Sequence, residues 1–496
     1  MAINSSLGTP EQLRDPNYTP PLASAVPLGI QHVLAMFVSN VTPAIIIAGA
    51  AGFGFGSNSP DFPHLIYMIQ MSMLFAGVAT LFQTIGFGPV GARLPIVQGT
   101  SFAFIPIMIP LVAGKGVDAM GALMCGVIVG GLFHALLGTI IGKIRFALPP
   151  LVTGLVVTMI GLALVKVGIQ YAAGGVPAMF KLTGALAAAK SSGTPADLSG
   201  VEYGSLLNWG VALVVIVVTL GVKFFTRGIV SVAAVLIGLI VGYVVAYFLG
   251  MVSFDNVGRA AVFALPQPFH FGFDFSIAAI VGFCLMSFIS AVETVGDVSG
   301  ITKGGAGREA TTEEIRGATF ADGIGTFISG LFGALPNTSF SQNVGLIAMT
   351  GVMSRTVVTI GALFLIAGGF FPKVGAVIST VPIEVLGGGV IVMFGMVVAA
   401  GISMLSDVNW NRRNMVIFAI SISVGLGLQL EPNALFHLPV TAKVLLTSGL
   451  LPAAFLAILL NLVLPEEIGD DQTEEIAGGL AGHKNDQAAP VPGDRT

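Results

Sequence analysis

The chain has 496 residues, of which 54% are apolar and 9% are charged, and its formal net charge is −4. Because an ordinary soluble domain carries about a quarter charged residues, this composition excludes a water-soluble enzyme, a nucleic-acid-binding protein and a disordered protein. Both cysteines, Cys125 and Cys284, lie in apolar runs, so we expect neither a disulfide framework nor a metal site.

Long stretches without Asp, Glu, Lys or Arg set the positions of the predicted elements. A membrane-spanning helix needs about 20 mostly apolar residues, and the chain has room for about 14 such segments with their connections. In chain order we predict them at residues 26–51, 64–86, 95–114, 119–142, 149–170, 205–224, 229–250, 272–298, 309–333, 337–352, 354–372, 376–402, 414–430 and 442–464. The sequence therefore predicts an all-α polytopic membrane protein.

The basic residues predict the orientation of these segments. With both termini in the cytoplasm, about two thirds of the 21 Lys and Arg residues fall on the cytoplasmic side, which is the bias that short membrane loops show. Residues 1–25 then form a cytoplasmic N-terminal segment, and the longest outside connection spans about 171–204. The acidic tail at 465–496 is predicted to be cytoplasmic and disordered.

The third and tenth segments are poor continuous helices. The third has Pro95 and Pro106 at its ends and Gly and Ser within, and the tenth, from Leu335 to Gly345, is too polar to face lipid. We predict that each contains a short extended stretch that leads into a half-helix. Non-helical backbone at membrane depth is tolerated where it lines a cavity, so these segments mark the predicted binding site.

The two interrupted segments also share a pattern. Leu94-Pro95 followed by Thr100-Ser101-Phe102 recurs as Leu335-Pro336 followed by Thr338-Ser339-Phe340. With seven segments per half, the second copy would enter the membrane upside down, which is the inverted repeat of many secondary transporters. The alternative is a chance match, since Pro, Gly and Ser are common in membrane helices.

Glu293 is the sharpest candidate for chemistry, because an ionisable group at membrane depth is costly unless it is paired or hydrated. It follows the apolar run of the eighth segment, and Asp297 lies one helical turn farther on the same face. Two neighbouring carboxylates repel each other when both are charged, so at least one could hold a proton near neutral pH. The alternative is a structural carboxylate that pairs with Lys303 or caps the next helix.

Two other polar residues fall within predicted segments. Asp322 is flanked by Ala321 and Gly323, where it could be a hydrogen-bonding group between closely packed helices or a proton relay. His32 in the first segment could also relay protons. We favour a supporting role for it, in which it bonds to a neighbouring helix and holds the site in shape.

The half-helix of the tenth segment begins with polar side chains, among them Gln342. The Gln342 amide offers one acceptor and two donors, so it can make paired hydrogen bonds to a flat heterocycle. The third segment supplies Ser101 and Phe102 at the matching place. Phe102 and Phe340, one from each repeat, could sandwich a planar ligand.

These residues resemble those of the nucleobase–ascorbate transporters and, within that family, the bacterial xanthine and uric acid permeases. The resemblance covers most of the chain, and its motifs are Gln31-His-Val-Leu-Ala-Met-Phe37, Glu293-Thr-Val-Gly-Asp297, Ala321-Asp-Gly323 and Gln342-Asn-Val-Gly-Leu-Ile-Ala-Met-Thr350. Many members have a second Asn where this chain has Val344. The choice between xanthine and uric acid therefore stays open.

The resemblance implies a fold of about 14 segments in two inverted seven-segment repeats. A core domain would comprise residues 26–142 and 272–372, and a gate domain residues 149–250 and 376–464. Family members are typically homodimers whose core domain slides against the gate domain in an elevator-like motion. We expect the same here, with membrane lipid around the dimer.

The resemblance also implies two groups of site residues. The substrate-binding residues would be Glu293, Gln342, Phe102, Phe340, Ser101 and Ser341. The residues that support the site or the proton coupling would be Asp297, Asp322, His32 and Asn343.

We therefore expect a symporter that imports xanthine, uric acid or both across a bacterial inner membrane, with the proton as coupling ion and no cofactor. The alternatives are a permease for uracil or another nucleobase with the same fold, and an anion carrier of the related sulfate-transporter fold. In an anion carrier of that fold, two half-helix N-termini face the anion, and such a site favours a neutral or basic residue where Glu293 stands. The carboxylate of Glu293 therefore argues against the anion carrier. The segments contain no nucleophile–base pair, so we expect no enzymatic activity.

Overall fold

The structure is a computed structural model, and it describes residues 8–53, 61–144, 147–192, 195–196, 198–406 and 408–465. The predicted tail after residue 465 and the first seven residues of the predicted N-terminal segment lie outside this described part.

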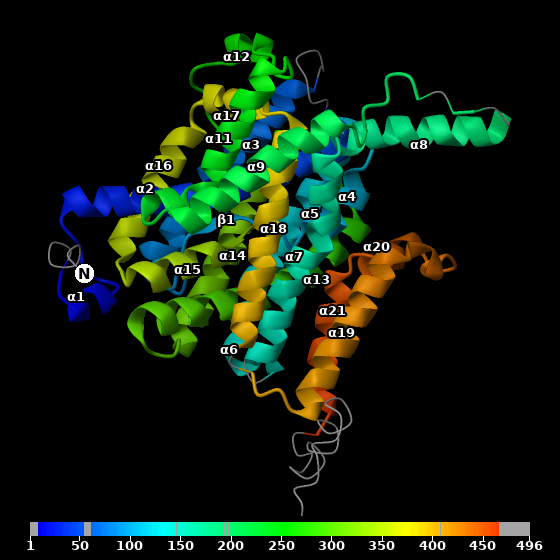
Figure 1. Ribbon diagram of the computed structural model, residues 1–496. Coiled ribbons are helices and arrows are strands. Elements are labelled where there is room, and N and C mark those ends of the chain that lie inside the picture. The colour runs from blue at the N-terminus through cyan, green and yellow to red at the C-terminus, as the bar shows by residue number, and fades with distance from the viewer. Residues whose placement is uncertain are drawn as a thin grey trace, which may run out of the picture.

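The described chain is mostly helical (Figure 1). The longer helices are α2 (Leu22–Ala51), α3 (Phe62–Thr84), α5 (Met120–Leu137), α7 (Pro150–Ala172), α8 (Gly175–Ser192), α9 (Leu206–Phe225), α11 (Ala234–Phe248), α13 (Ile277–Ile301), α14 (Thr312–Leu331), α16 (Arg355–Gly369), α18 (Ile383–Leu405), α19 (Arg412–Leu430) and α21 (Leu450–Val463). The shorter ones are α1 (Pro10–Arg14), α4 (Ile105–Val112), η2 (Gly116–Ala119), α6 (Ile141–Ile144), α10 (Ile229–Val232), α12 (Asp255–Arg259), η4 (Thr302–Ala306), α15 (Ser341–Thr350), α17 (Pro372–Ser379), η5 (Pro432–Leu435) and α20 (Val440–Leu446).

Several helices are suited to crossing a membrane. Among the described residues, eight helices are long and apolar enough to do so, or nine if the bent pair α16 and α17 counts as one span. Many of their apolar side chains are exposed, as on α9, where Leu206, Leu213 and Val217 are all more than half exposed. The prediction of a multi-pass membrane protein is confirmed.

Glycines allow the central helices to pack closely. α7 lies along α18, and α5 lies along α14 (Figure 1). A Cβ atom at Gly387 of α18 would clash with the backbone of Ala172 in α7, and one at Gly323 of α14 would clash with Ala135 of α5. Small residues at such interfaces let two helix backbones touch, which gives membrane helices their van der Waals contact.

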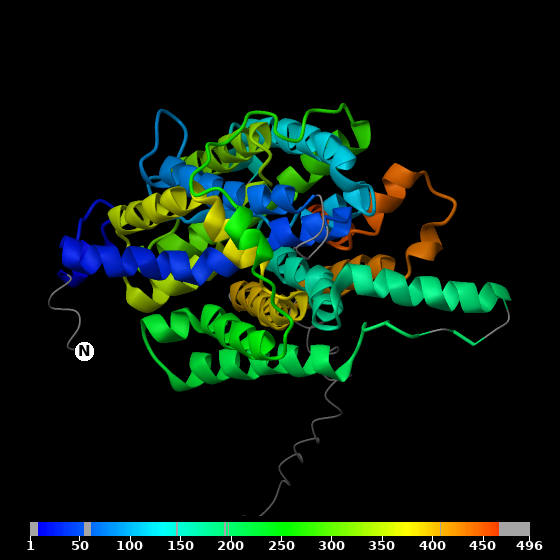
Figure 2. The ribbon, with the colours of Figure 1, turned by 90° about the horizontal axis from the view of Figure 1, so that it is seen from above.

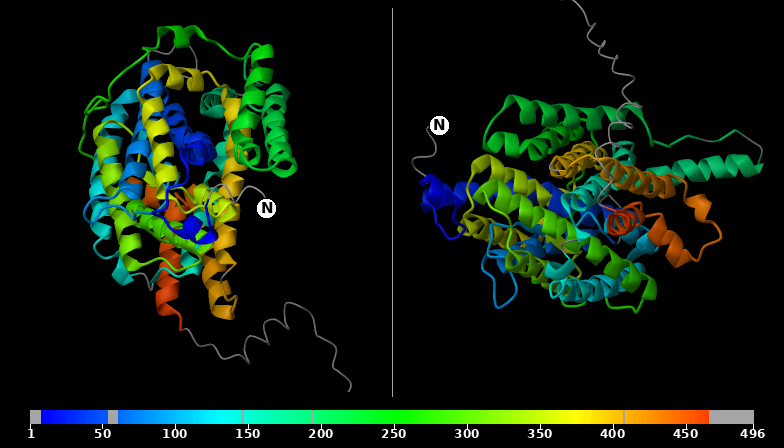
Figure 3. Two further views of the ribbon diagram at one scale, coloured as in Figure 1. Left: turned by 90° about the vertical axis from the view of Figure 1, so that its left-hand side faces the viewer. Right: turned by 90° about the horizontal axis from the view of Figure 1, so that it is seen from below.

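Three groups of helices surround these pairs. α9 and α11 form a layer on one face of the molecule (Figure 2) and pack beside α18 (Figure 3). α19 and α21 pack together at another edge (Figure 1). α8, which lies in the predicted connection at 171–204, projects away from the bundle (Figures 1 and 2), and most of its residues are exposed.

Two short strands cross within the bundle. β1 (Gln98–Thr100) and β2 (Asn337–Ser339) pair antiparallel, with Gln98 opposite Ser339 and Thr100 opposite Asn337. Each strand is followed within a few residues by a short helix, α4 after β1 and α15 after β2. The predicted extended stretches in the third and tenth segments are confirmed.

Three segments that we predicted as continuous helices are interrupted, and these predictions are wrong. The segment at 376–402 divides at residues 380–382 into α17 and α18, because Pro382 has no N–H to continue the helix. The segment at 229–250 breaks at Ala233, and the segment at 442–464 breaks at residues 447–449, where Gly449 has a φ of 73°. α16 and α17 also meet at an angle of 83°.

Candidate functional site

Each strand is held by a threonine from a neighbouring helix. The backbone N–H of Gln98 in β1 donates to Oγ1 of Thr80 in α3 at 2.9 Å. The backbone N–H of Asn337 in β2 donates to Oγ1 of Thr326 in α14 at 3.0 Å. A further N–H of β1 donates to Oδ1 of Asn40 in α2 at 2.9 Å. The non-helical backbone thus finds its partners inside the protein, as a low-dielectric interior requires.

Asp322 joins three elements around this crossing. Its carboxylate accepts from the side-chain amide of Gln83 in α3 at 2.8 Å and from the hydroxyl of Thr294 in α13 at 2.5 Å. The amide of Gln98 in β1 donates to the same carboxylate. Asp322 is therefore a hydrogen-bonding group that connects α14 with α3, α13 and β1. Hydrogen bonding between packed helices is one of the two roles that the sequence left open for it.

Asp297 and Glu293 face the second strand. Oδ2 of Asp297 accepts from the hydroxyl of Ser339 at 2.9 Å, and Oδ1 accepts from Ser341 at 2.7 Å. Glu293 accepts a long hydrogen bond of 3.5 Å from the hydroxyl of Thr338. Asp297 therefore accepts bonds from two serine side chains, one in β2 and one in α15, whereas the one side-chain hydrogen bond of Glu293 among the described residues is the long bond from Thr338.

These three carboxylates share a buried and uncompensated setting. Glu293 is 8% exposed, and Asp297 and Asp322 are fully buried. Within the described residues, all of their side-chain hydrogen bonds come from hydroxyl and amide groups rather than from Lys, Arg or His. Removing a charged carboxylate from water without a cation costs several kcal/mol, so a buried cluster of this kind marks a candidate functional site.

His32 and Asn343 form a second polar contact beside the crossing. Nδ2 of Asn343 in α15 lies 2.9 Å from Nδ1 of His32 in α2 and 3.4 Å from the backbone oxygen of His32. Both side chains are buried. The structure thus places His32 against the half-helix that carries the predicted binding residues.

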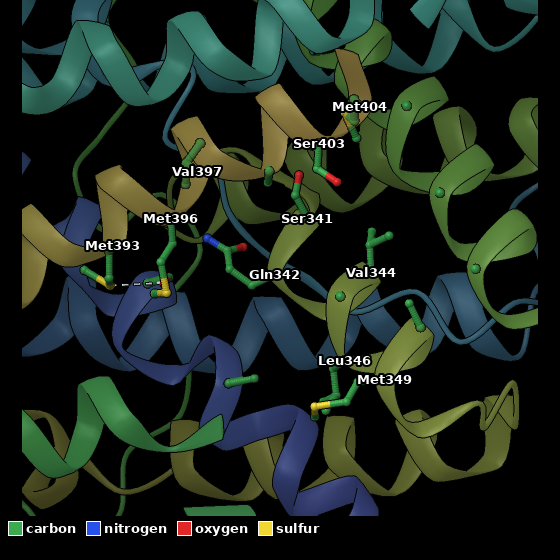
Figure 4. A pocket seen from close by; sticks show the side chains of 18 of the residues that line it. Ser341, Gln342, Val344, Leu346, Met349, Met393, Met396, Val397, Ser403 and Met404 are labelled. Atoms are coloured by element: carbon green, nitrogen blue, oxygen red, sulfur yellow. Dashed lines mark hydrogen bonds between the residues drawn. The ribbon is translucent and has the colours of Figure 1, made fainter. Parts of the chain in front are cut away.

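A cavity of about 1010 Å³ opens beside α15. Figure 4 shows Ser341 and Gln342 extending from α15 toward α18, whose Met393, Met396 and Val397 form the facing wall. Lining residues with charged side chains come from α9 and from the η4 region, namely Lys223, Lys303 and Glu309. The cavity is large enough for a small planar ligand, and α15 contributes two of its polar side chains, Ser341 and Gln342.

The predicted binding residues do not all reach this cavity. Ser341 and Gln342 line it, whereas the other four predicted contacts do not. These four side chains are no more than 8% exposed: Glu293, Ser101, Phe102 and Phe340. The strand crossing brings the six residues into one region of the fold, but of these six only Ser341 and Gln342, both in α15, line the cavity.

The two predicted ring contacts are packed against protein. Phe102 meets Phe394 of α18 edge-on, with ring centroids 5.2 Å apart and an interplanar angle of 86°. Phe340 covers Gly99 of β1 and belongs to a buried cluster with Met36. Both rings therefore have protein contacts in this structure, Phe102 with α18 and Phe340 with β1.

Some residues of this region did not emerge from the sequence. Gln83 and Gln98 bond to Asp322, and amide side chains inside apolar runs were the signal that could have pointed to them. His134 in α5 is 1% exposed, and within the described part of the chain neither of its ring nitrogens has a hydrogen-bond partner. A histidine within an apolar run was the corresponding signal.

The model of the Permease family matches residues 23–186 and 181–433 of this chain. A xanthine permease of Bacillus subtilis (strain 168) is 34% identical over 441 residues, which cover 88% of this chain and 92% of the relative. A uric acid permease of the same strain is 34% identical over 453 residues, covering 90% and 95%. A xanthine permease of Escherichia coli (strain K12) is 33% identical over 470 residues, covering 93% and 95%.

Solved structures with the same fold are more distant in sequence. The transmembrane domain of a cyanobacterial bicarbonate transporter superposes with a TM-score of 0.52 at 13% identity, covering 89% of this chain and 97% of that chain. The structure of SLC26A9 gives a TM-score of 0.53 at 13% identity, covering 89% and 66%. At this identity the likeness shows the fold alone, which is that of a transporter.

Proposed function

Because the chain belongs to the nucleobase–ascorbate transporter family, within the branch of xanthine and uric acid permeases, we propose that it is a proton-coupled importer of oxidised purines. As a permease it is a transporter and not an enzyme. The proposed substrates are xanthine, uric acid or both, and the proposed location is a bacterial inner membrane with both termini in the cytoplasm.

The buried acid cluster is the observation that carries the proton coupling. Glu293, Asp297 and Asp322 accept bonds only from neutral groups of the described chain, so a bound proton relieves their mutual repulsion. Glu293 has the weakest hydrogen bond of the three and is the site proposed to exchange that proton. Protonation outside favours purine binding, and release of the purine inside lets the proton leave.

The substrate site is proposed at the strand crossing. Gln342 and Glu293 bind the polar edge of the purine, and Phe102 and Phe340 flank its ring, with Ser101 and Ser341 beside it. The supporting residues are those whose bonds fix the crossing: Asp297, Asp322, His32 and Asn343. Gln342 and Ser341 already line the cavity, which supports their direct contact with substrate.

The proposed architecture is a fold of about 14 segments in two inverted repeats. The antiparallel pairing of β1 with β2, and the matching ties from Thr80 and Thr326, support such a repeat. Residues 26–142 and 272–372 form the core domain, and residues 149–250 and 376–464 form the gate domain. We propose elevator-like motion of the core against the gate in a homodimer surrounded by lipid.

Replacing Glu293 with Gln tests the coupling directly. Glu293→Gln removes the exchangeable proton while keeping the shape of the side chain, so we expect concentrative xanthine uptake to be lost in a chain that still folds and inserts. Glu384→Gln, which makes the same change in α18 away from the cavity, serves as the matched control. Unchanged xanthine accumulation in Glu293→Gln would remove Glu293 from the mechanism.

A competition panel tests the substrate and the coupling ion. Uptake of labelled xanthine is measured against uric acid, hypoxanthine, uracil and ascorbate, with and without an uncoupler or sodium. Inhibition by uracil alone would move the chain to a pyrimidine permease. Concentrative uptake that survives the uncoupler but needs sodium would overturn proton coupling.

An anion carrier is the second candidate, because a bicarbonate transporter shares the fold. The carboxylate of Glu293 beside the two half-helices disfavours an inorganic anion there. Uptake of labelled bicarbonate or sulfate in the same uptake assay, without purine uptake, would support the anion carrier instead.

A further inference from the structure

The first described residues form a compact element of their own. Thr9 caps α1 reciprocally with Gln12: the Thr9 backbone N–H donates to Oε1 of Gln12 at 2.9 Å, and the Gln12 N–H donates to Oγ1 of Thr9 at 3.3 Å. A turn follows, in which the Tyr18 N–H donates to the backbone oxygen of Asp15 at 3.1 Å. Residues 9–19, here called the N-terminal brace, are thus locally ordered before α2 begins.

The N-terminal brace is bonded to the connection between α15 and α16. The backbone N–H of Met353 donates to the oxygen of Leu13 at 2.8 Å, and that of Arg355 donates to the oxygen of Pro16 at 3.0 Å. The hydroxyls of Thr19 and Thr356 lie 3.1 Å apart. The N-terminal brace accordingly lies beside the connection between α15 and α16, although the two are more than 300 residues apart in sequence (Figures 1 and 3).

Apolar contacts reinforce these bonds. Leu13 is 7% exposed and packs in a buried cluster with Ala25, Val352 and Val357. Tyr18 of the N-terminal brace and Leu28 of α2 pack against this cluster. The side chain of Leu13 therefore joins the N-terminal brace to Val352 in the connection and to Val357 in α16.

This connection sets one end of the half-helix that carries Gln342. α15 has ten residues, and an isolated helix of that length is marginal in water. Its first turn follows β2, and its last turn ends at Gly351, whose φ of 69° directs the chain into the bonded connection. α15 is thus held by β2 at one end and by the N-terminal brace past the other, in addition to the bonds of Ser341 to Asp297 and of Asn343 to His32.

We propose that the N-terminal brace positions α15 and thereby sets the affinity of the purine site. Leu13 of α1 is the principal positioning residue. It clusters with Val352, just past the C-terminal end of α15, whereas Gln342 lies at the N-terminal end of that helix. This inference rests on the proposed function, because it takes Gln342 as a substrate contact.

Leu13→Ala in the full chain tests the proposal. We expect the KM for xanthine uptake to rise by about fivefold to thirtyfold, the change that one or two kcal/mol produces, with the maximal rate kept within about twofold. A merely structural residue would lower the maximal rate through the amount of folded protein instead. Leu22→Ala is the matched control, since Leu22 is 69% exposed nearby, and it should leave both values unchanged.

Hydrogen–deuterium exchange of the purified chain gives a second readout that does not depend on transport. In Leu13→Ala the amides of 341–356 should exchange several-fold faster, whereas those of α7 should not change. Faster exchange with an unchanged KM would overturn the link between the N-terminal brace and the site. Unchanged exchange would overturn its hold on α15.

A milder variant keeps the test decisive if Leu13→Ala inserts poorly. Thr9→Ala removes only the cap of α1, and it should shift the KM and the exchange in the same direction by a smaller factor. If the wild-type chain takes up no purine, the proposed function fails, while the exchange data still decide whether the N-terminal brace holds α15.

Discussion

Single side chains of the same type have different roles in this structure because their hydrogen bonds differ. Asp297 and Asp322 each accept at least two short bonds from neutral groups, which favours the supporting role proposed for them. Glu293 accepts only one long bond, from Thr338, within the described chain. A carboxylate that is held loosely can gain and lose a proton without dismantling its surroundings, which is why the proposed coupling site is Glu293.

His134 is the clearest case of a side chain whose burial costs stability. Among the described residues its ring nitrogens have no partner, and an unsatisfied buried polar group costs about 1–3 kcal/mol. We expect His134→Leu to raise the melting temperature of the purified protein by roughly a few degrees, because the apolar side chain has no such requirement. A thermal scan in detergent measures the shift.

Phe133→Leu, at the neighbouring and less buried position, serves as the control for this substitution. A lower melting temperature in His134→Leu would show that the ring nitrogens are in fact satisfied. A higher melting temperature together with lost uptake would show that the unsatisfied histidine serves transport.

Among the elements, the strand crossing is the most sensitive to side-chain size. A Cβ at Gly99 of β1 would clash with the ring of Phe340 and approach the methyl group of Met36 to 2.7 Å. We expect Gly99→Ala to displace Phe340 and to raise the KM for purine uptake by about tenfold, since a displacement costing about 1.4 kcal/mol has that effect. Uptake kinetics in whole cells check this.

Gly395→Ala in α18 is the control for the crossing, since a Cβ there meets nothing within 4 Å. It should leave the KM unchanged, because the added methyl group displaces no neighbouring atom. Wild-type kinetics in Gly99→Ala would mean that Phe340 is not held against β1 during transport.

The loop before α13 is predicted to respond to acid. His270 stacks on Tyr67 with ring centroids 3.7 Å apart, and its Nε2 lies 3.1 Å from Nδ1 of His64. Burial, and then the neighbouring His64 ring, lowers the pKa of His270 from 6.5 to about 4. The undocked loop takes up a proton near pH 6.5 and the docked loop only near pH 4. Docking is therefore at full strength above pH 6.5 and weakens as the pH falls toward 4.

Hydrogen exchange measures the docking of this loop. The amides of Ala264 and Phe269 donate to Phe370 and Leu331, so they report on it directly. After correction for the intrinsic rate, we expect exchange at pH 5 to exceed that at pH 7.5 by about threefold or more. His270→Phe should abolish this difference. Equal corrected rates in the wild-type chain would contradict the assignment to His270.

For the whole molecule, the contacts between the proposed core and gate domains decide whether one moves against the other. Phe102 meets Phe394, and the Ser39 hydroxyl lies 3.2 Å from the sulfur of Met393. Phe394 and Met393 both belong to α18. The elevator proposal requires these contacts to break in each transport cycle. They are therefore the places where a covalent link should stop transport.

The paired substitution Ser39→Cys with Met393→Cys tests this motion. A short bifunctional thiol reagent should join the two positions and abolish uptake, and a reductant that cleaves the link should restore it. Ser39→Cys alone and Met393→Cys alone, which like the paired variant keep the native Cys125 and Cys284, are the controls for modification alone. Full uptake in the linked protein would rule out relative motion of α2 and α18.

The membrane class, the position of most helices and the two interrupted segments followed from local properties of the chain. Apolar runs of spanning length define helices wherever they occur, and Pro, Gly and polar clusters interrupt them regardless of their neighbours. Pro382 was equally visible in the sequence, yet the predicted segment at 376–402 ran across it, so the break between α17 and α18 was missed. The spacing of Glu293 and Asp297 likewise predicted a shared helical face.

The partners of these residues depended on contacts between distant parts of the chain. Asp322 is joined to Gln83, which lies 239 residues away in sequence, and Leu13 is joined to Met353. No local pattern encodes such pairs, because a hydrogen bond between helices depends on how the helices pack and on which side chains the packing leaves without water. Whether an acid in a membrane segment is a tie or a loosely held proton site is therefore settled by the folded arrangement around it.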